Sequence, residues 1–404
     1  MHISDIIGEK RVKQIKLLIS DAKHLLSKKQ DIITTNKYTL FQVNNQNTFF
    51  GYYDISPFCP QDNNIITYIS INEKTKEAGI FIDNLESGKP QLIAKTKVWN
   101  WQQGCRLRWL PYIHKSLLFN SSNENGYNST IYDLETKEII YKEHPYYDVD
   151  SKAKYGITTD FSRIGILRPG YGYTNFEYHI DSVSPQDPCV QIFEFKEEIL
   201  IDSISYSDVL KALGLNDAKL HEHKCYVNHL CFSPFENKFL FFFVEIINGY
   251  HQANMLVYDI NNKELVVLEK QMKVSHYMWD TKFSIIATCY DANHKCRYYR
   301  YSIQDDVTRS LFMDDKLNRD GHPGRLNDSL LVSDTYPDSS TSFQHLFTID
   351  SVNLKVMNLL DIYSNPHYYG ERRTDLHPRC NKAGTKISID VNVTGKRNML
   401  ILDI

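Results

Sequence analysis

The sequence contains 404 residues, carries a formal net charge of -3 and has an aromatic content of 13%. This length leaves the number of domains open, because all-β propellers and barrels exceed the usual domain size without dividing. The near-balanced charge excludes the broad basic surface that nucleic-acid binding by the whole molecule requires, and the many Tyr and Phe residues are typical of strand-rich folds.

The eight cysteines are scattered, with no CxxC pair and no dense disulfide spacing, so we expect them to be reduced. No stretch approaches the roughly 18 apolar residues that a membrane-spanning helix needs. The first residues also lack the short apolar core and cleavage site of a secretion signal. We therefore expect a cytoplasmic protein.

Residues 1–35 differ from the rest of the chain and predict a helical extension. Aliphatic residues recur at spacings of three to five between residues 3 and 26, while Lys and Arg fill the other faces. Two interpretations remain open. The helix packs on the body of the protein, or it rests on an anionic membrane surface through residues 3–29, which needs this mixture of aliphatic and basic faces.

From residue 36 onward, short β-type runs separated by turn residues repeat in a common order. Each unit opens on a polar residue, continues through apolar strands, and reaches a strand such as IYDL (131–134) or VYDI (257–260). Three successive openings are 47, 46 and 55 residues apart (229, 276, 322 and 377), as in a four-stranded propeller blade. The seven openings are Tyr53-Asp54, Trp99-Asn100, Tyr146-Tyr147, Asn228-His229, Ser275-His276, Gly321-His322 and Leu376-His377.

The sequence therefore predicts an all-β, seven-bladed β-propeller over residues 36–404. Its last unit stops after a third strand, and residues 38–43 can supply the fourth, which would close the ring and remove an exposed sheet edge. The third unit contains more residues than the others. We assign residues 205–226 as an insertion containing a short helix near residues 207–214, and we expect it to overhang the channel mouth.

Four histidines occupy the same position in four consecutive units. The first strand of a propeller blade lines the central channel, so residues at equivalent positions converge on the axis. Converging neutral imidazoles can hold Zn²⁺, Mn²⁺ or a similar divalent metal, since each offers one nitrogen lone pair. The alternative is that each histidine only caps a strand or bonds to the next blade. These candidate metal ligands are His229, His276, His322 and His377.

Two further segments carry candidate substrate groups. In RPGYGY (168–173), glycines and a proline fix a tight backbone that exposes Arg168, Tyr171 and Tyr173, unless it is only a blade turn. A guanidinium can grip a carboxylate, and a phenol can move a proton or stack on a sugar. In WNWQQG (99–104), Asn100 or Gln102 at the blade opening would face the same mouth, although the tryptophans are as often core residues.

The chain lacks the GxGxxG, GxxxxGK, GxSxG and HExxH motifs, so the familiar nucleotide, serine-hydrolase and zinc-protease chemistries are unsupported. The segments WNWQQG, SRIGILRPGYGY (162–173), VNHLCFSP (227–234), SHYMW (275–279), DGHP (320–323) and DLHPR (375–379) resemble the blade openings of oligogalacturonate-lyase-like and ulvan-lyase-like propellers. The similarity covers most of residues 50–404. Three features depart from it, namely decayed Ser-Pro-Asp-Gly turns, the missing secretion signal and the basic N-terminal helix.

The resemblance implies β-elimination on an acidic, uronic-acid-containing polysaccharide at a histidine-lined mouth. It marks the four histidines as the ring, with His229, His322, Arg168 and Tyr173 as catalytic candidates. Elimination requires that the uronate carboxylate is neutralised, the C5 proton removed and the leaving oxygen protonated, tasks that Arg or a metal, His and Tyr can perform. The candidate substrate-binding residues are Asn100, Gln102, Tyr171 and Arg379.

Two other function classes remain open. One is a cytoplasmic glycosyltransferase-like enzyme or glycan-binding accessory factor in capsule or lipopolysaccharide assembly, which explains the missing secretion signal better than a lyase does. The other is a propeller that serves as an interaction platform without chemistry, because fold does not determine function.

Overall fold

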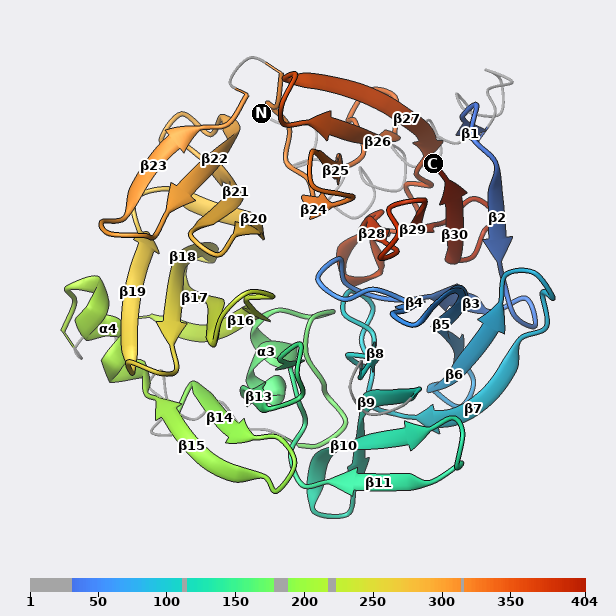
Figure 1. The fold of residues 1–404 in the computed structure, drawn as a ribbon, viewed down its shortest axis with the longest axis horizontal. Coiled ribbons are helices and arrows are strands. Elements are labelled where there is room, and N and C mark those ends of the chain that lie inside the picture. Colours follow the sequence, from blue (N-terminus) through green and yellow to red (C-terminus); the bar gives the residue numbers. More distant parts are fainter. Residues whose placement is uncertain (1–30, 111–114, 178–187, 217–222, 314–315) are drawn as a thin grey trace, which may run out of the picture.

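The computed structural model describes residues 31–110, 115–177, 188–216, 223–313 and 316–404. Within these ranges the chain forms seven antiparallel sheets arranged around a central axis (Figure 1), which confirms the seven-bladed propeller. The helix expected at residues 3–29 lies outside the described residues. No helix in the described ranges is long and apolar enough to cross a membrane, and all eight cysteines are free.

We number the blades 1 to 7 in chain order. Blade 1 contains β3 (Asn47–Phe49), β4 (Phe58–Cys59), β5 (Asp62–Asn72), β6 (Glu77–Asn84) and β7 (Gln91–Thr96). Blade 2 contains β8 (Arg108–Trp109), β9 (Ser116–Asn123), β10 (Gly126–Asp133) and β11 (Ile139–Lys142). Blade 3 contains β12 (Asp148–Val149), β13 (Tyr155–Thr158), β14 (Val190–Glu194) and β15 (Ile199–Ile204).

Blade 4 contains β16 (Lys224–Phe232), β17 (Lys238–Ile247), β18 (Tyr250–Asp259) and β19 (Glu264–Glu269). Blade 5 contains β20 (Lys273–Thr281), β21 (Ser284–Tyr290), β22 (Cys296–Ser302) and β23 (Thr308–Leu311). Blade 6 contains β24 (Gly324–Arg325), β25 (Leu330–Asp334), β26 (Phe343–Asp350), β27 (Lys355–Tyr363) and β1 (Ile32–Ile33). Blade 7 contains β28 (Arg379–Cys380), β29 (Lys386–Val391), β30 (Asn398–Asp403) and β2 (Tyr38–Phe41).

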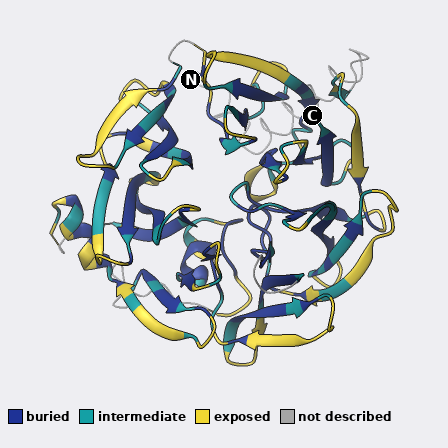
Figure 2. Cartoon of the chain, in the orientation of Figure 1, coloured by how far each residue is buried: buried dark blue, intermediate teal, exposed yellow. Residues whose placement is uncertain are grey.

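The hydrophobic pattern of each strand follows its distance from the axis. A strand in the middle of a blade packs against the blades on both sides, so β17 reads as a nearly continuous apolar run, KFLFFFVEII, with seven successive buried residues. The outermost strands face solvent, and Figure 2 shows them largely exposed, with the burial concentrated in the inner and middle strands. This gradient places the apolar core between blades and leaves the short inner strands to line the axis.

The ring closes as the sequence predicts. Strand β2, near the N-terminal end of the described chain, pairs antiparallel with β30 at the C-terminus, so that Tyr38 faces Leu402 and Phe41 faces Met399. Blade 7 thus obtains its fourth and outermost strand from before blade 1 (Figure 1), and this pairing closes the ring. Strand β1 adds a fifth strand to the outer edge of blade 6 by pairing with β27.

The expected overhang by residues 205–226 is wrong for the helix of this segment, and residues 217–222 lie outside the described chain. The helix there, α4 (Tyr206–Leu213), is capped by Ser205 and ended by Gly214, but it lies at the rim beside β19 (Figure 1) because its apolar face packs between blades. The insertion near the axis comes earlier in blade 3. There α3 (Phe161–Leu167) and the loop after it lie between β13 and β14 and contact β16.

Candidate active site

The structure brings the four predicted histidines together at the axis. The ring centroids of His276 and His322 are 4.0 Å apart, those of His322 and His377 are 4.4 Å apart, and His229 lies 6.2 Å from His276. His276 comes from β20 and His229 from β16, whereas the other two directly precede the short strands β24 and β28. The common position in four blades therefore produces one cluster.

Two of these histidines have an unusual backbone. His229 has φ +56° and His377 has φ +49°, and β16 has a register shift between Asn228 and Cys231. A bulge lets one residue leave the strand's alternation, and non-glycine residues rarely adopt positive φ unless their surroundings hold them there. The hydroxyl of Tyr147 accepts the His229 N–H at 3.0 Å, and the Tyr277 hydroxyl donates to the His229 carbonyl.

Buried acceptors orient three of the imidazoles. Nδ1 of His276 lies 3.1 Å from Asp320 Oδ1, and Nδ1 of His322 lies 2.9 Å from Asp334 Oδ1. Nδ1 of His377 lies 2.9 Å from the carbonyl oxygen of Gly51. A carbonyl cannot donate, so the Nδ1 of His377 carries the proton and its Nε2 has a free lone pair. Asp334 also accepts the backbone N–H groups of His322 and His377.

The Nε2 atoms of His322 and His377 are buried, and neither has a hydrogen-bond partner among the described residues. His322, His377 and Asp375 each offer one donor atom, and these atoms all lie within 4.8 Å of one another. Two imidazole nitrogens and a carboxylate oxygen suit a divalent transition metal, and the buried acceptors on Nδ1 provide the outer support typical of metal-binding histidines. The residues present therefore fit such an ion.

The metal set predicted from sequence needs correction. Within the described ranges, the donor group contains His322 and His377 but neither His229 nor His276. The Nε2 of His276 instead lies 3.4 Å from the Tyr336 hydroxyl. Asp375 was missed, although it stands two residues before His377 in DLHPR, a spacing that in extended chain puts both side chains on one side.

Burial determines most of the charge state of the cluster. It lowers the pKa of His229 and His377 well below the usual value, and neighbouring positive groups add to this effect. The pKa of His276 is also lowered, first by burial and then by His322. Burial opposes the charge of His322 as well, but the carboxylates of Asp334, Asp375 and Asp320 together outweigh it and raise that pKa. Three of the four imidazoles are therefore neutral near pH 7.

Two arginines and two tyrosines adjoin the histidines. Arg168 lies over the ring of Tyr171 at 5.1 Å, and Arg373 lies over the ring of Tyr336 at 4.5 Å while its guanidinium forms two 2.7 Å contacts with Asp375. Tyr171 is edge-on to His229 at 6.1 Å. The prediction for Arg168 and Tyr171 thus agrees with their position. Tyr336, Arg373 and Tyr52 were missed because they stand outside the segments singled out, and Tyr53 was used only to mark the first blade opening.

Tyr52 is the most enclosed of these phenols. Its ring centroid lies 4.7 Å from that of His377 and 5.2 Å from that of His229, and its buried hydroxyl has no partner in the parts of the chain that the structure describes. Burial raises the pKa of Tyr52 well above its usual value, so it keeps its proton at neutral pH.

Four other residues that the sequence predicted for the site are held by contacts with the surrounding protein. Tyr173 is 1% exposed and stacks on Phe161 at 4.7 Å, so it belongs to the core. Arg379 is paired with the buried carboxylate of Asp390 at 2.9 Å. Gln102 is buried and donates to two backbone carbonyls. The side-chain oxygen of Asn100 accepts two backbone N–H groups of its own turn, and Asn100 lines a different groove.

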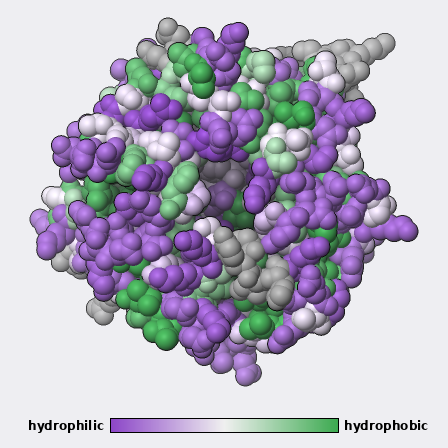
Figure 3. Space-filling view, viewed as in Figure 1, coloured by the Kyte–Doolittle hydropathy of each residue, from purple (hydrophilic) through white to green (hydrophobic). Residues whose placement is uncertain are grey.

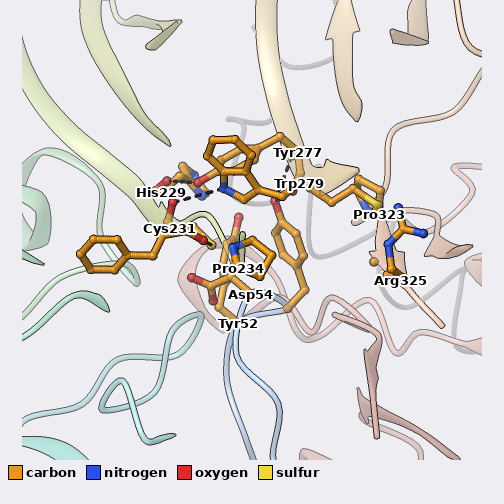
Figure 4. Close-up of a pocket in the computed structure, with 13 residues that line it drawn as sticks. Tyr52, Asp54, His229, Cys231, Pro234, Tyr277, Trp279, Pro323 and Arg325 are labelled. Carbon is orange, nitrogen blue, oxygen red and sulfur yellow. Dashed lines mark hydrogen bonds between the residues drawn. The ribbon is translucent and has the colours of Figure 1, made fainter. Parts of the chain in front are cut away.

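A pocket of about 240 Å³ reaches His229 from the end of the channel where the inner strands finish (Figure 4). Its walls are mainly aromatic, and it includes Tyr52, Tyr277 and Trp279 together with Cys231 and Arg325, which follow the histidines in the chain. On the face drawn in Figure 3, hydrophilic side chains predominate and the surface is hollowed near the centre of the ring. His229 is therefore accessible from this pocket.

Comparison with known proteins supports the fold. The chain is similar to a crystal structure of an oligogalacturonate lyase from Vibrio parahaemolyticus, with a TM-score of 0.62 and 12% identity over 93% of this chain and 98% of the other. It is also similar to an oligogalacturonate lyase in complex with manganese, with a TM-score of 0.61 and 11% identity over the same shares. No family model matches the sequence, and no curated protein matches it.

Proposed function

We propose that this protein is a lyase that cleaves a uronic-acid-containing polysaccharide or oligosaccharide by β-elimination at the histidine cluster. The observation that carries the proposal is the combination in one place of a neutral, partly accessible His229, a group of metal donors and two arginines. The structural similarity to oligogalacturonate lyases, one of them in complex with manganese, adds support.

The arginines would bind the substrate carboxylate. Arg168 has no carboxylate partner among the described residues, so its fork of N–H donors is available for paired hydrogen bonds to a uronate. Arg373 would supply a second positive charge beside the same phenols, while its contact with Asp375 fixes its position. A charge held on the carboxylate stabilises the enolate-like state that forms when the C5 proton leaves.

His229 would take the C5 proton. Its lowered pKa leaves the imidazole neutral, and the residue is partly exposed and lines the pocket of about 240 Å³. The electron pair of the C5–H bond then forms the C4–C5 double bond as the C4–O bond breaks. The leaving oxygen receives a proton from a phenol beside His229, for which Tyr52 and Tyr171 are the candidates, since burial keeps both protonated. No water is consumed.

A divalent metal fits beside this set. His322, His377 and Asp375 would hold it, with Asp334 and Gly51 orienting the two imidazoles. When bound, such an ion supplies Lewis-acid neutralisation of a substrate carboxylate or oxygen. Metal analysis of the purified protein should find about one divalent ion per chain, and His377→Ala should lose it.

Incubation with a panel of uronate polymers tests the reaction. We expect an unsaturated uronate, detected by its ultraviolet absorbance, with the wild-type protein, and no product with Arg168→Ala at an unchanged melting temperature. Lys95→Ala, which alters an exposed lysine on β7, is the matched control. If no polymer gives unsaturated product while the protein binds a glycan or sugar nucleotide, the lyase proposal fails and a role in polysaccharide assembly replaces it.

A further inference from the structure

A second cavity lies next to the mouth, outside the histidine cluster. It is a groove of about 790 Å³ bounded by the β5–β6 turn, the segment that leads into blade 2, the loop after α3 and the short helix η1 (Gly370–Arg372). None of the four histidines lines it. Its walls contain residues of the WNWQQG segment, which the proposed reaction does not use.

The groove contains an aromatic face between two lysines. The Trp99 indole is partly exposed, and its N–H donates to the carbonyl of Lys76 at 2.9 Å, which fixes the ring. Trp101 supports it edge-on at 5.1 Å. Lys97 stands two residues before Trp99, and both residues line the groove. An aromatic face of this kind suits the apolar face of a sugar ring.

The charge of the groove is positive on balance, because three basic residues (Lys76, Lys97 and Arg372) and two acidic residues (Glu73 and Glu371) line it. Lys76 and Lys97 are exposed, and no carboxylate in the described chain pairs with either. The acidic Glu73 is already paired with Arg372 at 3.3 Å and with Lys396 at 3.5 Å. The two free ammonium groups therefore remain to attract an anion.

One hydrogen-bond donor in the wall of the groove, the Asn100 side-chain amide, has no partner among the described residues. Asn100 is 5% exposed and lines the groove, and its side-chain oxygen accepts the backbone N–H groups of Gln102 and Gln103. These contacts orient the amide, and its Nδ2 has no hydrogen-bond partner among the described residues. Buried amide donors normally have one, so this group is available to a hydroxyl or carboxylate oxygen.

One wall separates the groove from the mouth. The Gln102 N–H donates to the Gly170 carbonyl at 3.0 Å, and its side-chain amide donates to the carbonyls of Glu371 and Arg373. A Cβ at Gly170 would lie 2.9 Å from that of Glu371, so the glycine lets the two loops approach. Arg168 and Arg373 are on the mouth side of these loops, whereas Pro169 and Arg372 line the groove.

We infer that the groove is a subsite for an acidic sugar residue of the same glycan, further along the chain from the unit that occupies the histidine cluster, because the wall lies between the two places. The ring would stack on Trp99, its carboxylate would face Lys76 and Lys97, and a hydroxyl would accept from Asn100. This inference rests on the proposed function for the nature of the chain, but it concerns binding alone. It predicts that longer acidic oligosaccharides bind more tightly than short ones.

Calorimetric titration in a His229→Gln background, which should keep the ligand intact, tests this. We use oligogalacturonate dimer and hexamer, and a neutral hexasaccharide as the charge control. The hexamer should bind more tightly than the dimer and the neutral probe. Trp99→Ala should reduce the hexamer-to-dimer affinity ratio about 3–10-fold, and Lys97→Ala about 2–5-fold. Lys95→Ala, on the same approach to blade 2 but outside the groove, should leave the ratio unchanged.

The outcomes separate the two proposals. If both groove variants bind the hexamer as the parent does, the subsite is refuted even where the wild-type protein cleaves the hexamer. If the hexamer binds through Trp99 and Lys97 but the wild-type protein never forms unsaturated product, the lyase proposal fails and the subsite stands. If neither acidic oligomer binds, or the neutral probe binds equally well, the inference of an acidic-sugar subsite is wrong. Because Trp99 packs partly on the core, Lys97→Ala remains informative if Trp99→Ala does not fold.

Discussion

Blades 1 to 3 and blades 4 to 7 place polar residues near the axis at equivalent positions, but the two regions complete their hydrogen bonds differently. In the first region, the Arg106 guanidinium donates twice to the Asp54 carboxylate and once to the Tyr147 carbonyl. In the second region, the Nε2 atoms of His322 and His377 are buried without a described partner. Buried polar atoms are normally paired. The contrast indicates that the Arg106–Asp54 pair of the first region acts as a support, whereas blades 6 and 7 supply free nitrogen atoms to the site.

The two regions meet at His229. The Tyr147 hydroxyl, held by Gln103 at 2.6 Å and by Asn228 at 2.8 Å, accepts the His229 N–H. Arg106 lies over the Tyr147 ring at 4.1 Å, so the buried ion pair and the histidine are joined through one tyrosine. A positive φ at a non-glycine residue persists only where the surroundings enforce it. The support in blades 1 to 3 therefore helps to hold the proposed base in place.

The largest expected effect is at that base. His229→Gln keeps the size and polarity of the side chain but removes the proton acceptor, so turnover should fall about 10²–10⁴-fold, while the melting temperature changes little. Steady-state rates of product formation and a thermal denaturation curve provide the measurement. A variant that retains more than a tenth of the wild-type rate would show that another group takes the proton.

An effect of similar size is expected in the supporting region, but on the free energy of unfolding and not on turnover. Arg106→Met leaves the Asp54 carboxylate without its buried partner and should lower the free energy of unfolding by about 3–5 kcal/mol, measured by urea denaturation. The double variant Asp54→Asn/Arg106→Met should recover part of this loss. As a control, Lys196→Ala removes one side of the exposed Lys196–Glu197 pair and should leave stability unchanged. Equal losses in Arg106→Met and Lys196→Ala would contradict the assigned support.

The pH dependence of kcat/KM tests the charge state of His229. Burial is the main cause of the lowered pKa of His229, with His276 and Arg168 adding to it. A lowered pKa means that the neutral base persists to lower pH, so kcat/KM should decline only below about pH 6.5, the ordinary value of histidine. Arg168→Gln removes one of the neighbouring positive charges and should raise the pKa of His229, followed by NMR titration of the imidazole because this variant should not turn over, whereas Arg168→Lys should not raise it. A decline centred above pH 6.5 in the wild-type protein would exclude His229 as the base.

The sequence alone was sufficient to predict the fold, because the repeated pattern of strands and turns marks the position of each blade. The spacing of the histidine openings and the missing last strand predicted the number of blades and the pairing of residues 38–43 with the C-terminal strand, and β2 and β30 confirm the pairing. The convergence of the four histidines follows from the same register. These features depend on backbone topology, which the hydrophobic pattern largely determines.

Side-chain direction in irregular segments could not be predicted in the same way. Tyr171 and Tyr173 are two residues apart in a glycine-rich loop, and only packing against α3 decides that Tyr173 enters the core while Tyr171 faces His229. Length alone did not show which part of blade 3 is inserted near the axis, so α4 was assigned to the mouth in place of α3. Arg379 follows His377 closely, yet the buried carboxylate of Asp390 determines its direction.

The smallest expected effect concerns the hydrogen bonds to Asp320, the carboxylate that orients His276. The Asp320 carboxylate accepts from Ser275 at 2.6 Å, from Tyr290 at 2.9 Å and from Thr288 at 3.0 Å, as well as from the Nδ1 of His276. Ser275→Ala removes one donor, and the other three continue to fix the carboxylate, so the free energy of unfolding should fall by only about 1 kcal/mol. Turnover should fall no more than a few-fold, because the orientation of His276 is retained. Asp320→Asn, which replaces the acceptor that orients His276 with an amide, should cost more in both measurements. If Ser275→Ala were as damaging as Asp320→Asn, the histidines would depend on a single serine contact and not on the carboxylate that several donors hold.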